Sequence, residues 1–416
     1  MEAWMNDVPR AVTETQRRLR AEVSDLAGRH RLLTEALRDE VSAIRAEQAQ
    51  GGAVPQIAYA DVAAGTVSAA DIARIKRRGC VVIRGVHDRA QVEAWNEEAI
   101  RYIDEVRYLE RMKDKAGLDQ YFSALASSRP QIYSLYWSKP QMMARQNPTL
   151  DTTRSWLNRL WTFEKDGTRY FEPDRQFNYA DRIRRREPGD STLGLSPHSD
   201  GGSVERWCEP TFRHVYRHVF EGDPLAFDPF DAEGRTTTRE IPSPAVCSAF
   251  RTFQGWTALT RQGPGDGTLQ LVPLAKTTPW MLTRALQPDV PEGDLCGAKP
   301  GRALGASRQW HPELLEGLVP IPQVEPGDTV WWHQDIIHAV EDHHRGSGYS
   351  NVIYIGAAPW CEKNAAYAAR QAEAFLAGRS SPDFAPEHYE LDFAGRAMAS
   401  DLSELGLRQM GLKAWD

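Results

Sequence analysis

Hydrophobic residues recur with helical spacing near the start of the chain. Between residues 10 and 50, steps of three, four or seven positions connect Leu19, Val23, Leu26, Leu33, Leu37 and Ile44. This spacing predicts one long helix with a single apolar stripe, which ends at the glycines 51–52. Such a stripe needs a partner surface. It either packs on the rest of its own chain or joins two chains in a homodimer.

Two further helices and a strand follow. Ser68 is typical of a helix N-terminus, because its side chain can cap a free backbone amide, and Gly79 is typical of the end of that helix. The apolar, β-branched run 80–86 predicts a buried strand. Residues 89–107 return to helical spacing.

The period changes to two from about residue 176, which indicates strands. These are expected at 177–186, 246–260, 268–274, 324–332 and 350–357. The Gly- and Pro-rich turn 263–267 predicts that the second and third of them form a hairpin. An Ala-rich helix is expected at 361–378, and a last helix in the tail after residue 380.

This order of elements favours a mainly β fold with flanking α-helices. Several short strands separated by Gly/Pro turns are typical of a β-sandwich or jelly roll. We divide the chain into an N-terminal helical extension, residues 1–54, and one domain, residues 55–416, that contains the strands and its own helices.

Composition and charge exclude several classes of protein. Hydrophobic residues make up 41% of the 416 residues and charged residues 26%, which rules out a disordered chain. No apolar run is long enough to span a bilayer, and the first residues contain no apolar secretory segment, so we expect a cytoplasmic protein. The net charge of −7 argues against nucleic acid as a partner. Five cysteines without a CxxC motif predict free thiols rather than disulfides or a zinc site.

Two segments carry residues that suit a metal ion. In the run His-Ser-Asp, His198 and Asp200 point to the same side of an extended backbone. A third ligand is expected from His338, at the far end of a strand that follows the turn 326–328. Two histidines and one carboxylate on one face leave open positions for non-haem Fe(II) chemistry. His333 lies five residues before His338, on the opposite side of a straight strand, so we expect His338 to be the ligand.

The combination of these motifs resembles the Fe(II)/2-oxoglutarate-dependent oxygenases. The closer resemblance is to the YbiU-like branch, a family described as a domain of unknown function. It rests on FRTFQGWTAL at 250–259, PGDTVWWHQDIIH at 326–338 and NVIYIGAAPWCEKNAAYA at 351–368, and it extends over most of the chain from about residue 55.

The resemblance implies a fold, cofactors and an activity. The fold is a double-stranded β-helix, related to the jelly roll and the cupins, preceded by the long N-terminal helix. Fe(II) is held by His198, Asp200 and His338, and 2-oxoglutarate and O2 are consumed. The implied reaction is oxidation of a small soluble metabolite, such as one of secondary metabolism, by hydroxylation, desaturation or cleavage.

One feature departs from the superfamily pattern. Its members usually carry an Arg or Lys about ten residues past the distal histidine, where it forms a fork with the far carboxylate of 2-oxoglutarate. Residues 349–354 contain no base, and Arg345 lies in the turn, only seven residues past His338. We favour Arg251, since a cation inside an apolar strand needs a partner. A structural salt bridge of Arg251 is the alternative.

Other residues remain candidates for this role. Ser350 and Asn351 are expected to add hydrogen bonds to 2-oxoglutarate, and Arg182 or Arg184 are further choices for the cation. The basic run 182–186 indicates either a solvated edge strand or a site for an anionic substrate.

The absence of the usual base keeps two other functions open. One is a cupin-like metalloenzyme that is not an oxygenase, such as an isomerase or lyase with Zn or Mn. The other is a binding protein with a decayed site.

Overall fold

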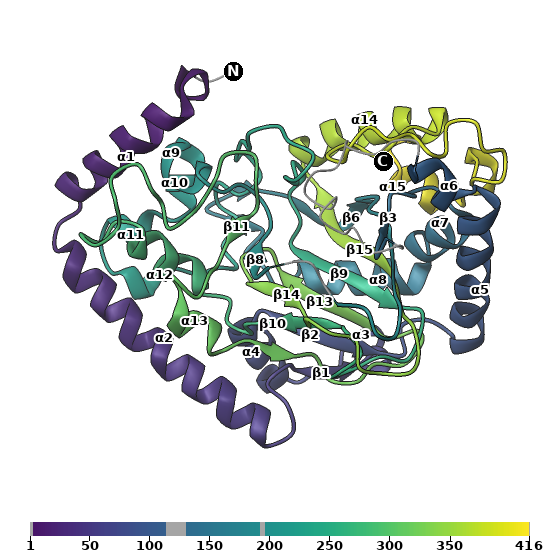
Figure 1. The fold of residues 1–416 in the computed structure, drawn as a ribbon, viewed down its shortest axis with the longest axis horizontal. Coiled ribbons are helices and arrows are strands. Elements are labelled where there is room, and N and C mark those ends of the chain that lie inside the picture. Colours follow the sequence, from purple (N-terminus) through teal and green to yellow (C-terminus); the bar gives the residue numbers. More distant parts are fainter. Residues whose placement is uncertain (1–2, 114–129, 192–195, 416) are drawn as a thin grey trace.

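Two β-sheets form the centre of the protein. The computed structural model describes residues 3–113, 130–191 and 196–415. The larger sheet has the order β1-β2-β13-β9-β15-β7-β3, with β6 paired to β15, and the smaller has the order β11-β8-β14-β10-β12 (Figure 1). The strands of the larger sheet are β1 Gln56–Ala58, β2 Cys80–Arg84, β3 Ile132–Tyr133, β6 Glu172–Phe177, β7 Ile183–Arg186, β9 Phe253–Ala258, β13 Thr329–His333 and β15 Ser350–Trp360. Those of the smaller sheet are β8 His198–Ser199, β10 Leu269–Leu271, β11 Leu304–Gly305, β12 Val319–Pro320 and β14 His338–Val340, and a separate pair is formed by β4 Glu164–Lys165 and β5 Thr168–Arg169.

The chain alternates between the two sheets. Strands β7, β9, β13 and β15 belong to the larger sheet, whereas β8, β10, β12 and β14, which come between them in sequence, belong to the smaller. Side chains from both sheets meet in one apolar cluster, which contains Trp256 and Trp332 from the larger sheet and Leu269 and Leu271 from the smaller. The sheets therefore pack face to face, as aligned sheets with apolar inner faces do.

This alternation corrects the predicted hairpin. Strand β9 is already hydrogen-bonded on one edge to β13 and on the other to β15, so neither edge is free for β10. The turn at 263–267 instead leads the chain into the smaller sheet, where β10 pairs with β12 and β14. The predicted strand 177–186 is also divided, because β6 ends at Phe177 and β7 begins at Ile183.

Helices lie on both sides of the sheets, so the fold is mixed α and β rather than mainly β (Figure 1). On one side are α1 Val8–Glu22, α2 Leu26–Ala49, α9 Glu205–Cys208, α10 Pro210–Val215, α11 Arg217–Phe220, α12 Thr277–Arg284 and α13 Pro312–Leu315. On the other are α5 Arg89–Glu105, α6 Tyr108–Lys113, α7 Lys139–Arg145, α8 Pro148–Asn158, α14 Glu362–Ala377 and α15 Glu404–Gln409, with α3 Tyr59–Ala64 and α4 Ala69–Arg78 beside β1 and β2. Three short 3-10 turns are η1 Ala3–Asn6, η2 Pro224–Ala226 and η3 Ala399–Asp401.

Several predicted elements are confirmed. Ser68 caps α4 and Gly79 ends it in the left-handed conformation, with φ of 64°. Strand β2 and helices α5 and α14 lie where the sequence places them. All five cysteines are free and buried. Among the described residues, no helix is both long and apolar enough to cross a membrane.

The predicted N-terminal helix is two helices. The break is at Asp25, which has φ of 47° and accepts a hydrogen bond from the Gly28 amide, so that it begins α2 as an N-cap. The apolar stripe nevertheless continues across the break. Its residues, including Leu33, Leu37 and Ile44, pack in one core cluster with Trp280 and other residues of the same chain. The stripe is thus covered within one chain, and the homodimer stays a prediction that needs another surface.

The packing of α2 leads to a test of stability. Leu37 is 3% exposed within this core cluster. Leu37→Ala is expected to lower the free energy of unfolding by about 2–5 kcal/mol, since it removes buried methyl groups and leaves a cavity. Urea unfolding followed by circular dichroism measures the change. Leu32, which is 42% exposed on the same helix, is the matched control, and an equal loss in Leu32→Ala would contradict this account.

Candidate metal centre and its pocket

Two neighbouring strands of the smaller sheet bring three candidate ligands together. Strand β8 pairs with β14 so that His198 stands opposite His338, and Asp200 follows directly after β8. The Nε2 atom of His198 lies 3.6 Å from Asp200 Oδ1, and that of His338 lies 3.8 Å from Asp200 Oδ2. One ligand atom from each residue lies within 4.8 Å of the other two. Among the described residues, these three form the one group with metal-ligand geometry.

The way in which His338 reaches this centre differs from the prediction. The strand after the turn 326–328 is β13, and it ends at His333. The next four residues carry the chain to the smaller sheet, and His338 begins β14 there. His338 is therefore the first residue of a second strand, not the far end of the first.

Backbone carbonyls orient both imidazole rings. His198 Nδ1 lies 2.6 Å from the Ser196 carbonyl oxygen, and His338 Nδ1 lies 3.1 Å from that of Ile336. A carbonyl oxygen only accepts, so each Nδ1 must carry the proton as donor. This leaves the lone pair of each Nε2 directed at the centre, the arrangement found for metal-binding histidines.

The electrostatic surroundings favour the protonation states that a metal requires. Burial lowers the pKa of His338 to about 4, with a further contribution from His198, so its ring is neutral near pH 7. Burial alone would raise the pKa of Asp200, but His338, His198 and Arg251 outweigh this effect and hold it below its ordinary value. A neutral imidazole and an ionised carboxylate are the forms that bind a metal.

His333 lies away from this centre. Its Nε2 donates to the Pro229 carbonyl at 2.9 Å, and its Nδ1 accepts from the Asp335 amide at 3.0 Å. The ring is fully buried and stacks on Trp161, with centroids 4.7 Å apart. Both ring nitrogens are used in the interior, and this position agrees with the preference for His338.

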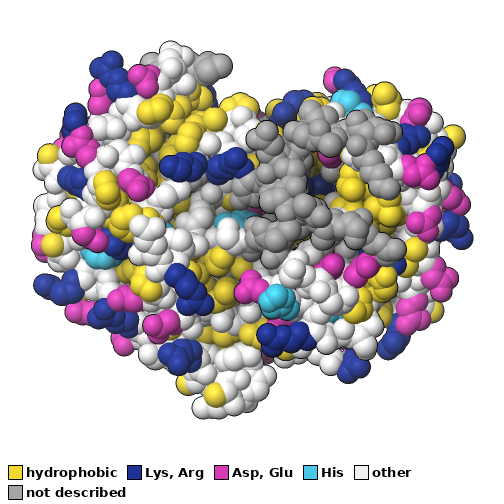
Figure 2. Space-filling view, in the orientation of Figure 1, with side chains coloured by type: hydrophobic (Ala, Val, Ile, Leu, Met, Phe, Trp, Pro, Cys, Tyr) yellow, Lys and Arg dark blue, Asp and Glu magenta, His cyan; other side chains and the backbone are white. Residues whose placement is uncertain are grey.

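A pocket opens beside the three residues. Figure 2 shows the molecule hollowed between its two sides, with histidine surface on the floor of the hollow. The cavity volume is about 140 Å³, close to that of an engineered cavity of roughly 150 Å³ that holds benzene. The rim is largely apolar and contains Pro244, Ala245, Val246, Ala303 and Phe384.

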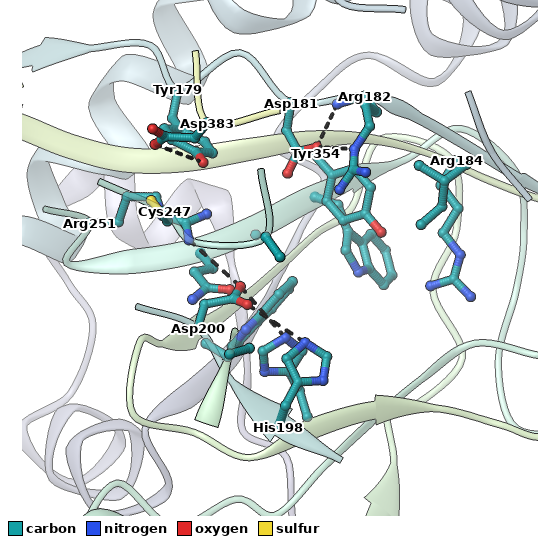
Figure 3. A pocket seen from close by; sticks show the side chains of 18 of the residues that line it. Tyr179, Asp181, Arg182, Arg184, His198, Asp200, Cys247, Arg251, Tyr354 and Asp383 are labelled. Carbon is teal, nitrogen blue, oxygen red and sulfur yellow. Dashed lines mark hydrogen bonds and ion pairs between the residues drawn. The ribbon is translucent and has the colours of Figure 1, made fainter. Parts of the chain in front are cut away.

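Arg251 lies in this pocket, next to the candidate ligands (Figure 3). Its Nη2 atom is 3.6 Å from Asp200 Oδ2, and its guanidinium lies 4.5 Å from the centroid of the Tyr179 ring. The sequence predicted a partner for this buried cation, and the partner is Asp200. Arg251 is placed just before β9, not within it.

Three other predicted residues are not brought to the pocket. The Ser350 hydroxyl donates to the Asp266 carbonyl at 2.6 Å, and the Asn351 amide donates to Asn96 on α5 at 2.9 Å. Arg345 lies exposed in the turn before β15. None of the three lines the cavity. Hydrogen bonds from Ser350 and Asn351 to 2-oxoglutarate stay a prediction.

Arg184 and Arg182 do line the cavity. Arg182 pairs with Asp181 at 3.1 Å and lies over the ring of Phe384. Arg184 is 7% exposed, and no carboxylate of the described chain lies within 4.0 Å of its guanidinium nitrogens. It is held on β7, which pairs with β15 on one edge and β3 on the other. The predicted solvated edge strand is therefore wrong, because β3 covers the second edge of β7 at Ile183 and Arg184.

The sequence did not single out two further polar groups of the pocket. Gln254 on β9 and Trp332 on β13 are 2% and 3% exposed, and both line the cavity. Gln254 Nε2 and Trp332 Nε1 have no hydrogen-bond partner among the described residues. Buried donors are usually paired with an acceptor, so these two are available to a ligand or an ordered water in the cavity. A glutamine within an apolar strand was the signal available in the sequence.

Known proteins place the chain in a family. The pattern of the Gig2-like family matches residues 6–412. The chain belongs to the Gig2-like family. The YbiU protein of Escherichia coli (strain K12), which is uncharacterized, is 44% identical to it over 405 residues, 97% of this chain and 96% of YbiU. This confirms the YbiU-like branch of the resemblance.

Solved structures agree with this assignment. A proposed oxidoreductase from Salmonella typhimurium LT2 is 41% identical, with a TM-score of 0.91, and the match covers 99% of this chain and 98% of the other. The GlcNAc-inducible GIG2 protein of Candida albicans is 27% identical, with a TM-score of 0.78, over 97% of this Gig2-like chain and 90% of its own. The family is thus shown, and its reaction has to be argued from the site.

Proposed function

We propose that this Gig2-like protein is an Fe(II)- and 2-oxoglutarate-dependent dioxygenase that oxidises a small soluble metabolite. The observation that carries the proposal is the convergence of His198, Asp200 and His338, with both histidine Nε2 atoms directed at one point. Two histidines and one carboxylate on one face are the ligand set of non-haem Fe(II) oxygenases. This set leaves three coordination positions of the metal open for substrates.

The order of the strands supports the double-stranded β-helix that the sequence resemblance implies. Strands that alternate between two facing sheets make up a double-stranded β-helix, the jelly-roll arrangement of the cupins. Here the chain passes back and forth between the sheets from β7 to β15, with β10, β11 and β12 all in the smaller sheet, and the candidate ligands come from two adjacent strands of that sheet. We infer that the core is a double-stranded β-helix and that its open end holds the metal.

The pocket also fits a dicarboxylate. A buried carboxylate is costly unless a cation and hydrogen bonds compensate it. Arg184 supplies a cation without a carboxylate partner in the described chain, and Gln254 and Trp332 supply free donors. We propose Arg184 as the partner of the far carboxylate of 2-oxoglutarate, since Arg251 already contacts Asp200.

A keto carbon and two methylene groups separate the carboxylates of 2-oxoglutarate. The cation for its far end must therefore lie away from the metal ligands. In Figure 3 Arg251 lies next to Asp200 at the left of the pocket, whereas Arg184 lies at its right. Arg251 is better placed to hold Asp200 and the near end of the cosubstrate.

When bound together, Fe(II) and 2-oxoglutarate would supply the chemistry that activates O2. His198, Asp200 and His338 would hold the metal, with each histidine Nδ1–H donating to its backbone carbonyl. Arg184 would orient the cosubstrate by a fork of two hydrogen bonds. The apolar rim, with Phe384, would bind the substrate and limit access of water to the pocket.

The substrate is proposed to be small because the cavity is. An anionic substrate is consistent with Arg182 at the wall, although its pairing with Asp181 reduces the net charge there. The reaction outcome, whether hydroxylation, desaturation or cleavage, depends on which substrate carbon the rim places nearest the metal.

An anaerobic titration tests the proposal. Fe(II) is added to the metal-free protein, followed by 2-oxoglutarate, and the visible spectrum is recorded. We expect one Fe(II) per chain and a weak visible charge-transfer band that forms only with both present. On exposure to O2, succinate should form. Tight binding of Zn without any response to 2-oxoglutarate would instead favour a metalloenzyme that is not an oxygenase.

A further inference from the structure

One buried arginine joins the two segments that carry the candidate ligands. Arg206 on α9 is 1% exposed. Its Nη2 atom donates to the Asp200 carbonyl at 3.0 Å and its Nε atom to the Gly202 carbonyl at 2.9 Å. Its Nη1 atom lies 3.1 Å from Asp335 Oδ1. One side chain thus contacts the turn after β8 and the segment before β14.

The first of these segments depends on Arg206 for its shape. Gly201 has φ of 84°, a conformation that suits glycine, and the turn that it forms directs the carbonyls of its two neighbours toward α9. These carbonyls have Arg206 as donor. Since the Asp200 side chain starts from this turn, the position of its carboxylate follows from the position of the backbone.

The second segment is fixed through Asp335, which is 1% exposed and lies three residues before His338. Asp335 Oδ2 accepts from Arg235 at 2.9 Å, and Oδ1 also accepts from the Tyr216 hydroxyl at 2.9 Å. Its backbone amide donates to His333, and its carbonyl accepts from Thr277. Burial alone would raise the pKa of Asp335, but Arg235 and Arg206 hold it well below the ordinary value, so the group is ionised.

Every N–H group of the Arg206 guanidinium donates to an acceptor. They contact the carbonyls of Asp200 and Gly202, Asp335, and the hydroxyls of Tyr216 and, at 3.5 Å, Ser199. A planar fork with five donors can bridge two segments at fixed angles, which the ammonium group of lysine cannot do. Neutralising the buried carboxylate of Asp335 alone would not require these additional contacts of Arg206.

We propose that Arg206, anchored by Asp335 and Tyr216, is a positioning residue that sets Asp200 relative to His338. The inference rests on the proposed function, because it assigns to Arg206 the geometry of the metal centre. Outer partners of metal ligands commonly contribute a factor of about 10–100 to metal affinity, and we expect Arg206 to contribute in this range.

The chain offers a matched control for a purely structural role. Arg235 contacts the other oxygen of Asp335, is 4% exposed, and has no hydrogen bond to the turn 200–202. Arg206→Lys and Arg235→Lys both keep the positive charge, and both lose a guanidinium hydrogen bond to the same carboxylate. Only the first removes the contacts to the turn that carries Asp200.

Binding of Co(II) to the full-length protein is the measurement, since the visible spectrum of Co(II) reports its coordination geometry. Arg206→Lys is expected to weaken Co(II) binding by about 10–100-fold and to change the spectrum. Arg235→Lys should lower the melting temperature while Co(II) affinity and spectrum stay close to wild type. Wild-type Co(II) affinity and spectrum in Arg206→Lys, or an equal loss in Arg235→Lys, would overturn the inference.

A milder variant applies if Arg206→Lys does not fold. Tyr216→Phe keeps every charge and removes the hydroxyl between Arg206 and Asp335. It should weaken Co(II) binding in the same direction and speed hydrogen exchange in residues 196–204. Unchanged affinity with unchanged exchange would count against Arg206. If the wild-type protein itself binds no Co(II) and no Fe(II), the proposed function fails, and this outcome is seen before any variant is compared.

Discussion

His338→Ala is expected to abolish stoichiometric Fe(II) binding and to leave the fold intact. His338 begins β14, and its Nε2 atom is one of two imidazole ligands directed at the proposed metal. Loss of one ligand from three should weaken binding by more than the roughly 10–100-fold typical of outer partners. His198→Ala should behave in the same way. Asp200→Ala should also weaken binding strongly, because it removes the one anionic ligand and leaves Arg251 unpaired.

His333→Ala provides the control for this result. His333 lies on the same segment but uses both ring nitrogens within the interior. Its loss leaves the Pro229 carbonyl and the Asp335 amide unsatisfied, at a cost of about 1–3 kcal/mol for a buried group. We expect lower stability in urea and unchanged Fe(II) stoichiometry in an anaerobic titration. Loss of Fe(II) binding in His333→Ala, with binding kept in His338→Ala, would show that the wrong histidine was chosen.

The sequence alone predicted the part of the candidate metal centre that depends on neighbouring residues, His198 and Asp200. A spacing of two on an extended backbone is enough to bring His198 and Asp200 to one side. It could not show how His338 arrives, because the run 329–338 contains no Gly or Pro that would mark the change of sheet after His333. The preference for His338 over His333 rested on parity along one strand, whereas their difference in position comes from two strands in two sheets.

The errors about the pocket have a similar cause. Strand β15 is covered on both faces, and nearly all of its residues are buried, so its sequence has no alternation to show which side chains face the cavity. The sequence therefore could not show that Ser350 and Asn351 lie outside the lining of the cavity. Strand β7 was misjudged in the opposite direction, because its sequence is polar although the strand lies inside the sheet. Its run of arginines suggested solvent, but β15 pairs with one edge, β3 pairs with the other at Ile183 and Arg184, and Arg184 is buried.

The predicted hairpin and the predicted single N-terminal helix are also wrong, for reasons that the local sequence does not show. A Gly/Pro turn between two apolar runs does not reveal that β9 already has two neighbours, β13 and β15. At Asp25 the apolar stripe continues without a gap, so only the cap geometry shows that the helix breaks. By contrast Ser68 and Gly79 were interpreted correctly, because capping depends on residues adjacent in sequence.

Arg184→Met is expected to raise the concentration of 2-oxoglutarate that the protein requires by about 100-fold or more. The estimate follows from a cost of roughly 3–5 kcal/mol when one partner of a buried charged pair is removed, with tenfold in affinity for each 1.4 kcal/mol. Fe(II) affinity should stay near wild type, because no hydrogen bond or ion pair joins Arg184 to the three candidate ligands in the described chain. Formation of the charge-transfer band against 2-oxoglutarate concentration measures the effect.

Two other arginines make this test specific. Arg185 is on the same strand, with its guanidinium over the ring of Tyr349, and it does not line the pocket, so Arg185→Met should bind 2-oxoglutarate normally. Arg251→Met removes the cation beside Asp200 and should change Fe(II) binding as well as that of the cosubstrate. If Arg184→Met binds 2-oxoglutarate as the wild type does and Arg251→Met loses that binding alone, the anchor is Arg251, as the sequence first suggested. A cation that serves the far carboxylate must be free of other acids. This requirement favours Arg184, which has no carboxylate partner among the described residues, whereas Arg251 contacts Asp200, a ligand of the proposed metal.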